Sequence, residues 1–244
     1  FALAEKLFGD LRDPEDAAPK IENPAGEPIA PRVVVIDQPG AGQAAIEAVS
    51  RSIARNDPDY YPLLLGNAVL GGGYSARLNA EIRVKRGLSY GASSGLGARV
   101  DDGLFSASTQ TRNDAAAEVV GLISTEVNRL SSELVSAEEL APRRATVLGS
   151  FSRSLETVSR LSSVVAGFAQ YGLPIEEFGQ YANKVRAVTP EQIRDAVERR
   201  LPAAAISYVV VGDAAQFLTP LSAAYPALEN IPLTELNLDS ATLR

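Results

Sequence analysis

Histidine and cysteine are both absent from this 244-residue sequence. Zinc sites in proteins draw their nitrogen and sulfur ligands from these two residue types, and carboxylates alone favour harder metal ions. The same absence excludes a Ser-His-Asp or Cys-His catalytic arrangement and any disulfide framework. We therefore expect that the chain holds no zinc by itself and has no metal site of its own.

An excess of basic charge and long apolar runs are missing too. The formal net charge is −7 and the basic residues are scattered, so the average field repels a nucleic-acid backbone or an anionic membrane surface. The longest apolar runs, such as residues 206–211, are far shorter than the roughly 20 residues of a membrane span. We expect neither nucleic acid nor a membrane as a partner. The lack of cysteine leaves the cytoplasm and the periplasm both open as compartments.

Methionine is absent as well, and the chain begins with Phe1, which indicates a piece of a longer translated product. Residues 1–12 place apolar side chains on one face of a helix. Residues 13–31 contain five prolines and few large apolar residues, which is typical of a linker. The predicted organisation is a terminal helix of a preceding domain, a proline-rich linker and a main domain over residues 32–244.

The main domain alternates between strand and helix patterns. Helical periodicity predicts a buried helix, a second helix that Ser75 caps and Gly87 stops, and nearly ninety helical residues from position 113. Capping-box patterns mark helix starts at Ser136 and Thr189. The predicted strands are residues 32–38, 43–54, 88–96, 103–111 and 204–211, and the first two helices are residues 60–70 and 75–86. This order predicts an α+β fold, a mainly antiparallel sheet with helices packed on one face.

The glycines at positions 71–73 are a poor match to a phosphate loop. Such a loop follows a strand and usually ends near a lysine, whereas these glycines follow a predicted helix and lead into Tyr74 and Ser75. Neighbouring carboxylates have local explanations, because residues 101–102 fit a hairpin turn and residues 138–139 fit a helix start. No well-spaced carboxylate pair stands out that would support a self-contained hydrolase.

Several segments together resemble one peptidase family. The segments that carry the resemblance are residues 38–43, 57–61, 71–78 (GGGYSARL), 82–90 (IRVKRGLSY), 138–144, 188–191 and 209–213 (VVVGD). In order and spacing they are similar to the C-terminal half of the pitrilysin family, the inverzincins that include insulin-degrading enzyme and mitochondrial processing peptidase. The resemblance covers roughly residues 32–217. It implies ferredoxin-like layers within the α+β fold.

The resemblance also implies a division of labour. In this family one half carries a His-x-x-Glu-His zinc motif, and the related half without it closes over the peptide substrate. This chain matches the half without the motif, so zinc is expected in a homologous partner half, fused upstream or in a separate subunit. Arg83 and Tyr90 match the family's catalytic arginine and tyrosine of this half. The expected substrate-binding residues are Gly71, Gly72, Gly73 and Arg77.

Arg83 and Tyr90 also carry chemical groups that suit peptide hydrolysis. Peptide hydrolysis builds negative charge on the carbonyl oxygen, which a guanidinium and a phenol can stabilise. The alternative is that Arg83 is an ordinary surface charge and Tyr90 a core aromatic, and Arg77 equally fits a structural ion pair. At the level of the whole chain, the alternative is a non-catalytic peptide-binding or scaffold subunit of the same fold, because fold does not fix function.

Overall fold

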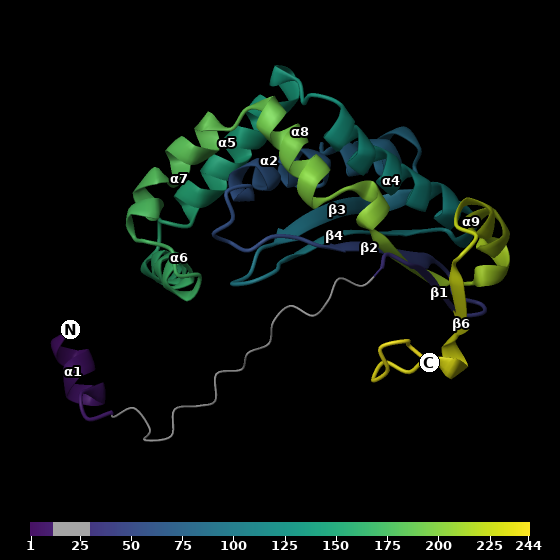
Figure 1. Cartoon of the computed structure of the whole chain (residues 1–244), viewed down its shortest axis with the longest axis horizontal. Coiled ribbons are helices and arrows are strands. Elements are labelled where there is room, and N and C mark those ends of the chain that lie inside the picture. Colours follow the sequence, from purple (N-terminus) through teal and green to yellow (C-terminus); the bar gives the residue numbers. More distant parts are fainter. Residues whose placement is uncertain (12–29) are drawn as a thin grey trace.

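The computed structural model describes residues 1–11 and 30–244. Helix α1 (Ala2–Phe8) has no buried residue and is drawn apart from the remainder (Figure 1). Most of the predicted linker, residues 13–31, lies outside the described residues. The boundary between a preceding domain and the main domain therefore stays a prediction.

Within the described residues, six strands form one sheet in the order β3-β4-β2-β5-β1-β6. The strands are β1 (Val33–Asp37), β2 (Ala44–Arg51), β3 (Ser89–Gly97), β4 (Leu104–Thr111), β5 (Ser207–Gly212) and β6 (Glu229–Pro232). Neighbours from β3 through β5 pair antiparallel, and β1 pairs in parallel with β5 and β6. The mainly antiparallel sheet is confirmed, and β6 is an addition that the sequence patterns did not indicate.

The helices form a second layer over one face of the sheet (Figure 1). They are α2 (Tyr60–Leu70), α3 (Arg77–Asn79), α4 (Ala116–Ser132), α5 (Ala137–Arg153), α6 (Val158–Gln170), α7 (Glu176–Ala187), α8 (Pro190–Arg200) and α9 (Leu218–Ala224). Helices α2 and α4 contact the strands directly, and α8 packs against both of them. The predicted α+β architecture is confirmed.

Strand β2 shows why the two faces differ. Ala44, Ile46 and Ala48 are buried under the helices, whereas Ala45 and Glu47 alternate with them and remain at least partly accessible. A period of two is the pattern of a strand with one covered face. The helices thus leave the centre of the opposite face of the sheet uncovered.

Capping confirms two of the predicted helix starts and corrects a third. Ser136 and Thr189 cap α5 and α8, and Thr189 completes its capping box. At α3 the N-cap residue is Ala76, without a side-chain cap hydrogen bond; Ser75 instead accepts a hydrogen bond from Arg143. Gly87 follows this helical segment with φ +62°, as a stop residue requires.

The end of α2 approaches β3 closely at Gly71. The Gly71 carbonyl accepts a hydrogen bond from the Ser94 backbone amide, and a Cβ at Gly71 would lie 2.2 Å from that same nitrogen. Asn67, one turn earlier, binds the Ser94 hydroxyl through its side-chain oxygen at 2.8 Å. Only glycine permits this contact, which sets the distance between α2 and the edge of the sheet.

Replacing Gly71 by alanine tests this contact. We expect Gly71→Ala to lower the free energy of unfolding by about 1–3 kcal/mol or more, because backbone must shift to admit the methyl group. Gly121→Ala is the matched control: Gly121 lies in α4 with no atom within 4 Å of its added Cβ, so alanine should stabilise the helix by about 0.5–1 kcal/mol. Urea unfolding of both variants is the measurement, and equal stability of the two would contradict the packing argument.

Candidate functional site

Arg83 lies in a widened helical turn at the edge of the sheet. Residues Ala80–Lys85 continue α3 as a π-helix, a form that occurs mostly as short insertions, frequently at functional sites. The Arg83 guanidinium carbon lies 5.0 Å from the ring centre of Tyr74 and 4.8 Å from that of Tyr90. A cation at these distances from aromatic faces is attracted to both rings. The structure thus brings together the two residues that the sequence singled out and adds a third, Tyr74.

The charge of Arg83 is distinctive because its neighbours are neutralised. Lys85 and Arg86 both form ion pairs with Glu81, and they hold the pKa of that carboxyl below its usual range, with the hydrogen bond from Lys85 as the main cause. Arg77 is paired with Glu139. By contrast, no carboxylate of the described residues forms an ion pair with Arg83. Its full positive charge is therefore available to a bound ligand.

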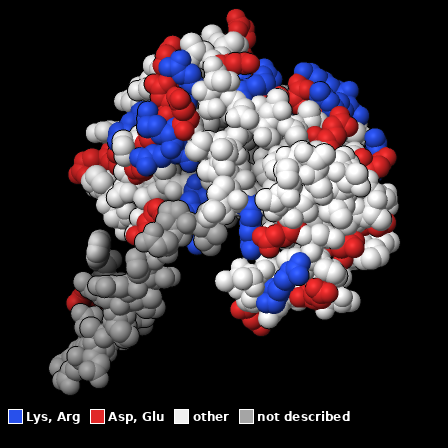
Figure 2. All heavy atoms as spheres, turned by 45° about the vertical axis from the view of Figure 1, so that its right-hand side comes forward, with Lys and Arg blue, Asp and Glu red and all other residues white. Residues whose placement is uncertain are grey.

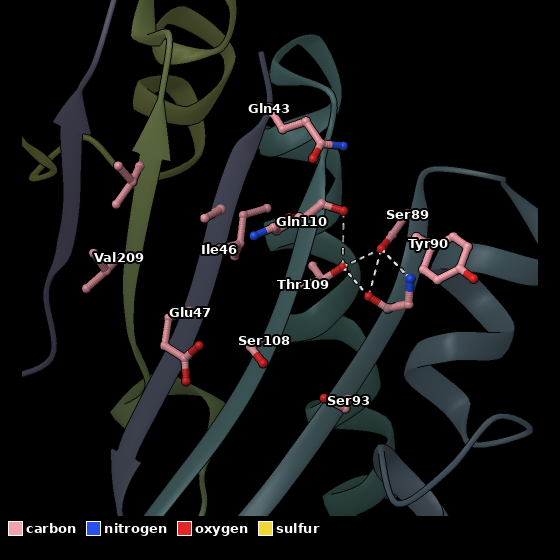
Figure 3. A pocket seen from close by; sticks show the side chains of 13 residues that line it. Gln43, Ile46, Glu47, Ser89, Tyr90, Ser93, Ser108, Thr109, Gln110 and Val209 are labelled. Atoms are coloured by element: carbon pink, nitrogen blue, oxygen red, sulfur yellow. Dashed lines mark hydrogen bonds between the residues drawn. The ribbon is translucent and has the colours of Figure 1, made fainter. Parts of the chain in front are cut away.

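Tyr90 is presented by a bulge in β3. The pairing with β4 shifts between Ser89 and Ala92, so that one extra residue is accommodated on β3. The Ser89 hydroxyl accepts a hydrogen bond from the Gly91 amide at 2.9 Å and lies 2.7 Å from the Thr109 hydroxyl of β4. Tyr90 is 89% exposed, and its ring points away from β2 and β4 (Figure 3). The phenol is therefore accessible at an edge strand.

A buried amide holds the pieces in place. Asn79 is 3% exposed, and it donates a hydrogen bond to the Tyr74 carbonyl at 2.6 Å. Its side-chain oxygen accepts from the Ala92 amide at 3.3 Å. Asn79 thus links the glycine-rich turn (residues 71–75) to the bulged strand β3. These two segments precede and follow Arg83 in the sequence.

The remaining predicted residues have structural partners. Gly71 and Gly72 lie in close packing, since a Cβ at Gly72 would lie 2.6 Å from the Ala68 Cα. Arg77 binds Glu139 bidentately, with both N–O distances 2.8 Å, which fits the structural alternative, although its third nitrogen, Nη1, is buried without a partner. Gly73 faces open space apart from Arg143. Their roles in substrate binding stay predictions.

Beside Ser89 and Tyr90, a groove crosses the open face of the sheet (Figure 3). Small or short side chains from β2, β4 and β5 line it, among them Ala45, Ser108 and Val209. Glu47 lies within the groove, and burial raises the pKa of this carboxyl, although a hydrogen bond with Ser106 opposes the rise. A shallow trough of small side chains can admit another backbone close to the sheet.

Sequence reasoning missed Tyr74, Asn79, Thr109 and Glu47. Tyr74 lies within the resembling segment 71–78 and Asn79 directly follows it, but nothing in their spacing indicated contact with β3. Among residues 1–11 and 30–244, no group of three or more potential ligand side chains could hold a metal ion, and no helix is long and apolar enough to cross a membrane. On the face shown in Figure 2, acidic and basic side chains are interspersed.

Residues 1–146 match the family model described as the peptidase M16 inactive domain. The match covers more than half of the chain, and the chain belongs to this family. The match begins at residue 1 and so spans the predicted domain boundary.

Individual relatives agree with the family. The chain is 25% identical over 219 residues to an uncharacterized zinc protease of Streptomyces coelicolor, covering 85% of this chain and 47% of the relative. It is 23% identical over 145 residues to the non-peptidase homolog YmxG of Helicobacter pylori, covering 59% of this chain and 34% of the relative. The chain thus spans half or less of the length of these curated relatives.

A crystal structure shows the same fold. The peptidase M16 inactive domain from Pseudomonas fluorescens superposes with a TM-score of 0.70 at 27% sequence identity, covering 75% of this chain and 44% of that one. The fold class predicted from the sequence is therefore confirmed by a solved member of the family.

The raised pKa of Glu47 gives a pH-dependent prediction. A carboxyl whose pKa is raised by folding favours the protonated form, so its ionised form destabilises the fold at neutral pH. We expect Glu47→Gln to be more stable than the parent at pH 7, and this advantage to shrink as the pH falls through the raised pKa of Glu47 and to vanish near the ordinary glutamate value of 4.5, where the carboxyl is protonated in the folded state. Urea unfolding of both proteins across pH 4–7 measures it. A variant less stable than the parent at pH 7 would contradict the burial argument.

Proposed function

We propose that this chain is the metal-free half of a zinc peptidase and acts when paired with a homologous zinc-bearing half. The observation that carries the proposal is the state of Arg83: a cation without a carboxylate partner among the described residues, held between two exposed tyrosines. Arg77 and Arg86, the neighbouring arginines of the same helical segment, are both paired with carboxylates. Membership of the M16 inactive-domain family supports the same conclusion.

In the proposed reaction, Arg83 and Tyr90 bind the oxygen of the scissile carbonyl. The guanidinium is permanently charged and donates through several N–H groups, and the phenol donates one O–H. Both interactions strengthen as negative charge builds on that oxygen, which is the condition for catalysis rather than simple binding. The zinc expected in the partner half would supply the activated water. This chain's own residues do not fit zinc ligation, because histidine and cysteine are absent.

The peptide substrate is proposed to lie along the edge of the sheet. Strand β3 is the edge strand on the side of the site, and the groove lined by small side chains continues from Tyr90 across β4 and β2. The Ala92 and Ser94 amides of β3 already donate to Asn79 and Gly71, so the peptide is proposed to occupy the groove beside this edge and not to add a strand to the sheet. Gly73 borders the site without a side chain and leaves room at the end of α2. Arg77 then contributes through its pair with Glu139, which fixes the start of the helix that carries Arg83.

A scaffold role is the second candidate. One relative at 23% identity is described as a non-peptidase homolog, so members of this family do not all cleave peptides. A scaffold needs the sheet, the helices and the partner interface, but it does not need an uncompensated arginine beside two tyrosines. Kinetics separate the two candidates.

The test is mutation of this chain within the assembled enzyme. We expect Arg83→Ala and Tyr90→Phe each to lower kcat by on the order of 10²-fold, as the loss of an oxyanion donor typically does. Zinc content and thermal stability should hardly change, because neither side chain is in the core. Hydrolysis of a fluorogenic peptide at saturating substrate is the measurement.

Lys85→Ala is the matched control. Lys85 lies two residues from Arg83 on the same helical segment, and its ion pair with Glu81 is a surface contact, generally worth less than about 1 kcal/mol. It should leave kcat unchanged. If both Arg83→Ala and Tyr90→Phe hydrolyse peptide at the parent rate, the scaffold candidate becomes the better account.

A further inference from the structure

A second arginine without an ion-pair partner among the described residues contacts the glycine-rich turn at residues 73–75. Arg143 of α5 donates a hydrogen bond from Nη2 to the Ser75 hydroxyl at 3.0 Å. Its Nε is buried without a hydrogen-bond partner. Its Nη1 lies 3.8 Å from the point where a Cβ of Gly73 would be, so the missing side chain at Gly73 leaves this nitrogen uncovered.

No nearby carboxylate neutralises Arg143. Glu139, one turn earlier on α5, is fully engaged by Arg77 through two hydrogen bonds of 2.8 Å. Among the described residues no ion pair involves Arg143. The Arg77 side chain is only 10% exposed, and its Nη1 is buried without a hydrogen-bond partner. Positive charge at the turn thus exceeds its local compensation, in a protein whose net charge is −7.

The turn connects this charge to the proposed catalytic residues. Ser75 contacts Arg143, and the adjacent Tyr74 contacts Arg83 through its ring. Two guanidinium groups without a carboxylate partner among the described residues thus contact adjacent residues of the turn. A buried hydrogen-bond donor that is left unsatisfied destabilises the fold, and guanidinium groups bind carboxylates in a bidentate fork.

We infer that Arg143 and Ser75 form a subsite for an acidic side chain of the peptide substrate. The inference rests on the proposed function and specifies its substrate class. The expected substrates are peptides with a glutamate or aspartate close to the scissile bond, because Tyr74, which contacts Arg83, is adjacent to Ser75. The Arg143 guanidinium binds the carboxylate, and the Ser75 hydroxyl, which accepts from Arg143, donates its own proton to the same group. The subsite selects substrates and takes no part in bond cleavage.

The experiment compares peptides that differ by one charge. A set of fluorogenic peptides carries glutamate or glutamine at successive positions on either side of the cleavage site, and kcat/KM is measured with the assembled enzyme. We expect the glutamate peptide to be preferred by about tenfold at one position, with the preference falling as salt is raised because exposed charges are screened. Arg143→Gln should reduce the ratio of the two kcat/KM values towards one.

Arg153→Gln is the matched control, since Arg153 lies on the same helix and likewise donates to a serine hydroxyl, that of Ser150 at 2.9 Å. It should leave the glutamate preference intact. Binding of both peptides to the chelator-treated assembled protein is measured in parallel. Equal dissociation constants for the glutamate and glutamine peptides at every position would overturn the subsite, whatever the rates. Failure to hydrolyse any peptide, with the binding preference retained, would instead count against the proposed function alone.

Discussion

The close approach of α2 to β3 at Gly71 is the constraint from which the site is built. The backbone contact between Gly71 and Ser94, with Asn67 bound to the same serine, fixes the end of α2 against the edge strand. The glycine-rich turn starts from that point, and the helix bearing Arg83 follows it. Because Tyr90 is on the same edge strand, this contact helps to set the separation between Tyr90 and the helical segment that carries Arg83.

Electrostatics then separates the arginines that we propose to bind substrate from those with carboxylate partners. Two guanidinium groups near the site have carboxylate partners: Arg77 pairs with Glu139 and Arg86 with Glu81. Arg83 and Arg143 do not, and both border the turn at residues 73–75. Keeping such charges uncompensated has a cost, which a substrate with a developing oxyanion and an acidic side chain would offset. This is consistent with a half-enzyme whose counter-charges arrive with the substrate.

Much of the fold could be read from the sequence because local signals and packing agree. The capping-box patterns at Ser136 and Thr189 each reflect a single local rule, and the structure confirms both helix starts. Strand β6 was missed because a four-residue parallel strand depends on its neighbour β1 more than on its own pattern. The π-helix was missed because its widened turn is set by tertiary contacts. The predicted cap at Ser75 was wrong because the Ser75 hydroxyl instead binds Arg143, which lies 68 residues away along the chain.

The site itself was only partly readable. Arg83 and Tyr90 came from a family resemblance, and spacing alone did not separate them from surface and core residues. What the structure adds is the aromatic pair around Arg83, the bulge that presents Tyr90 and the amide of Asn79 that links them. These contacts join segments whose relative position no local pattern specifies.

The central claim is that this chain supplies part of an active site that a zinc-bearing half alone lacks. The most direct measurement is complementation: the separately produced zinc-bearing half is titrated with this chain, and complex formation and peptide hydrolysis are followed together. The account predicts little hydrolysis by either half alone and a rate that rises with complex formation to saturation at one chain per zinc-bearing half. A zinc-bearing half that hydrolyses peptide equally well with and without this chain would contradict it.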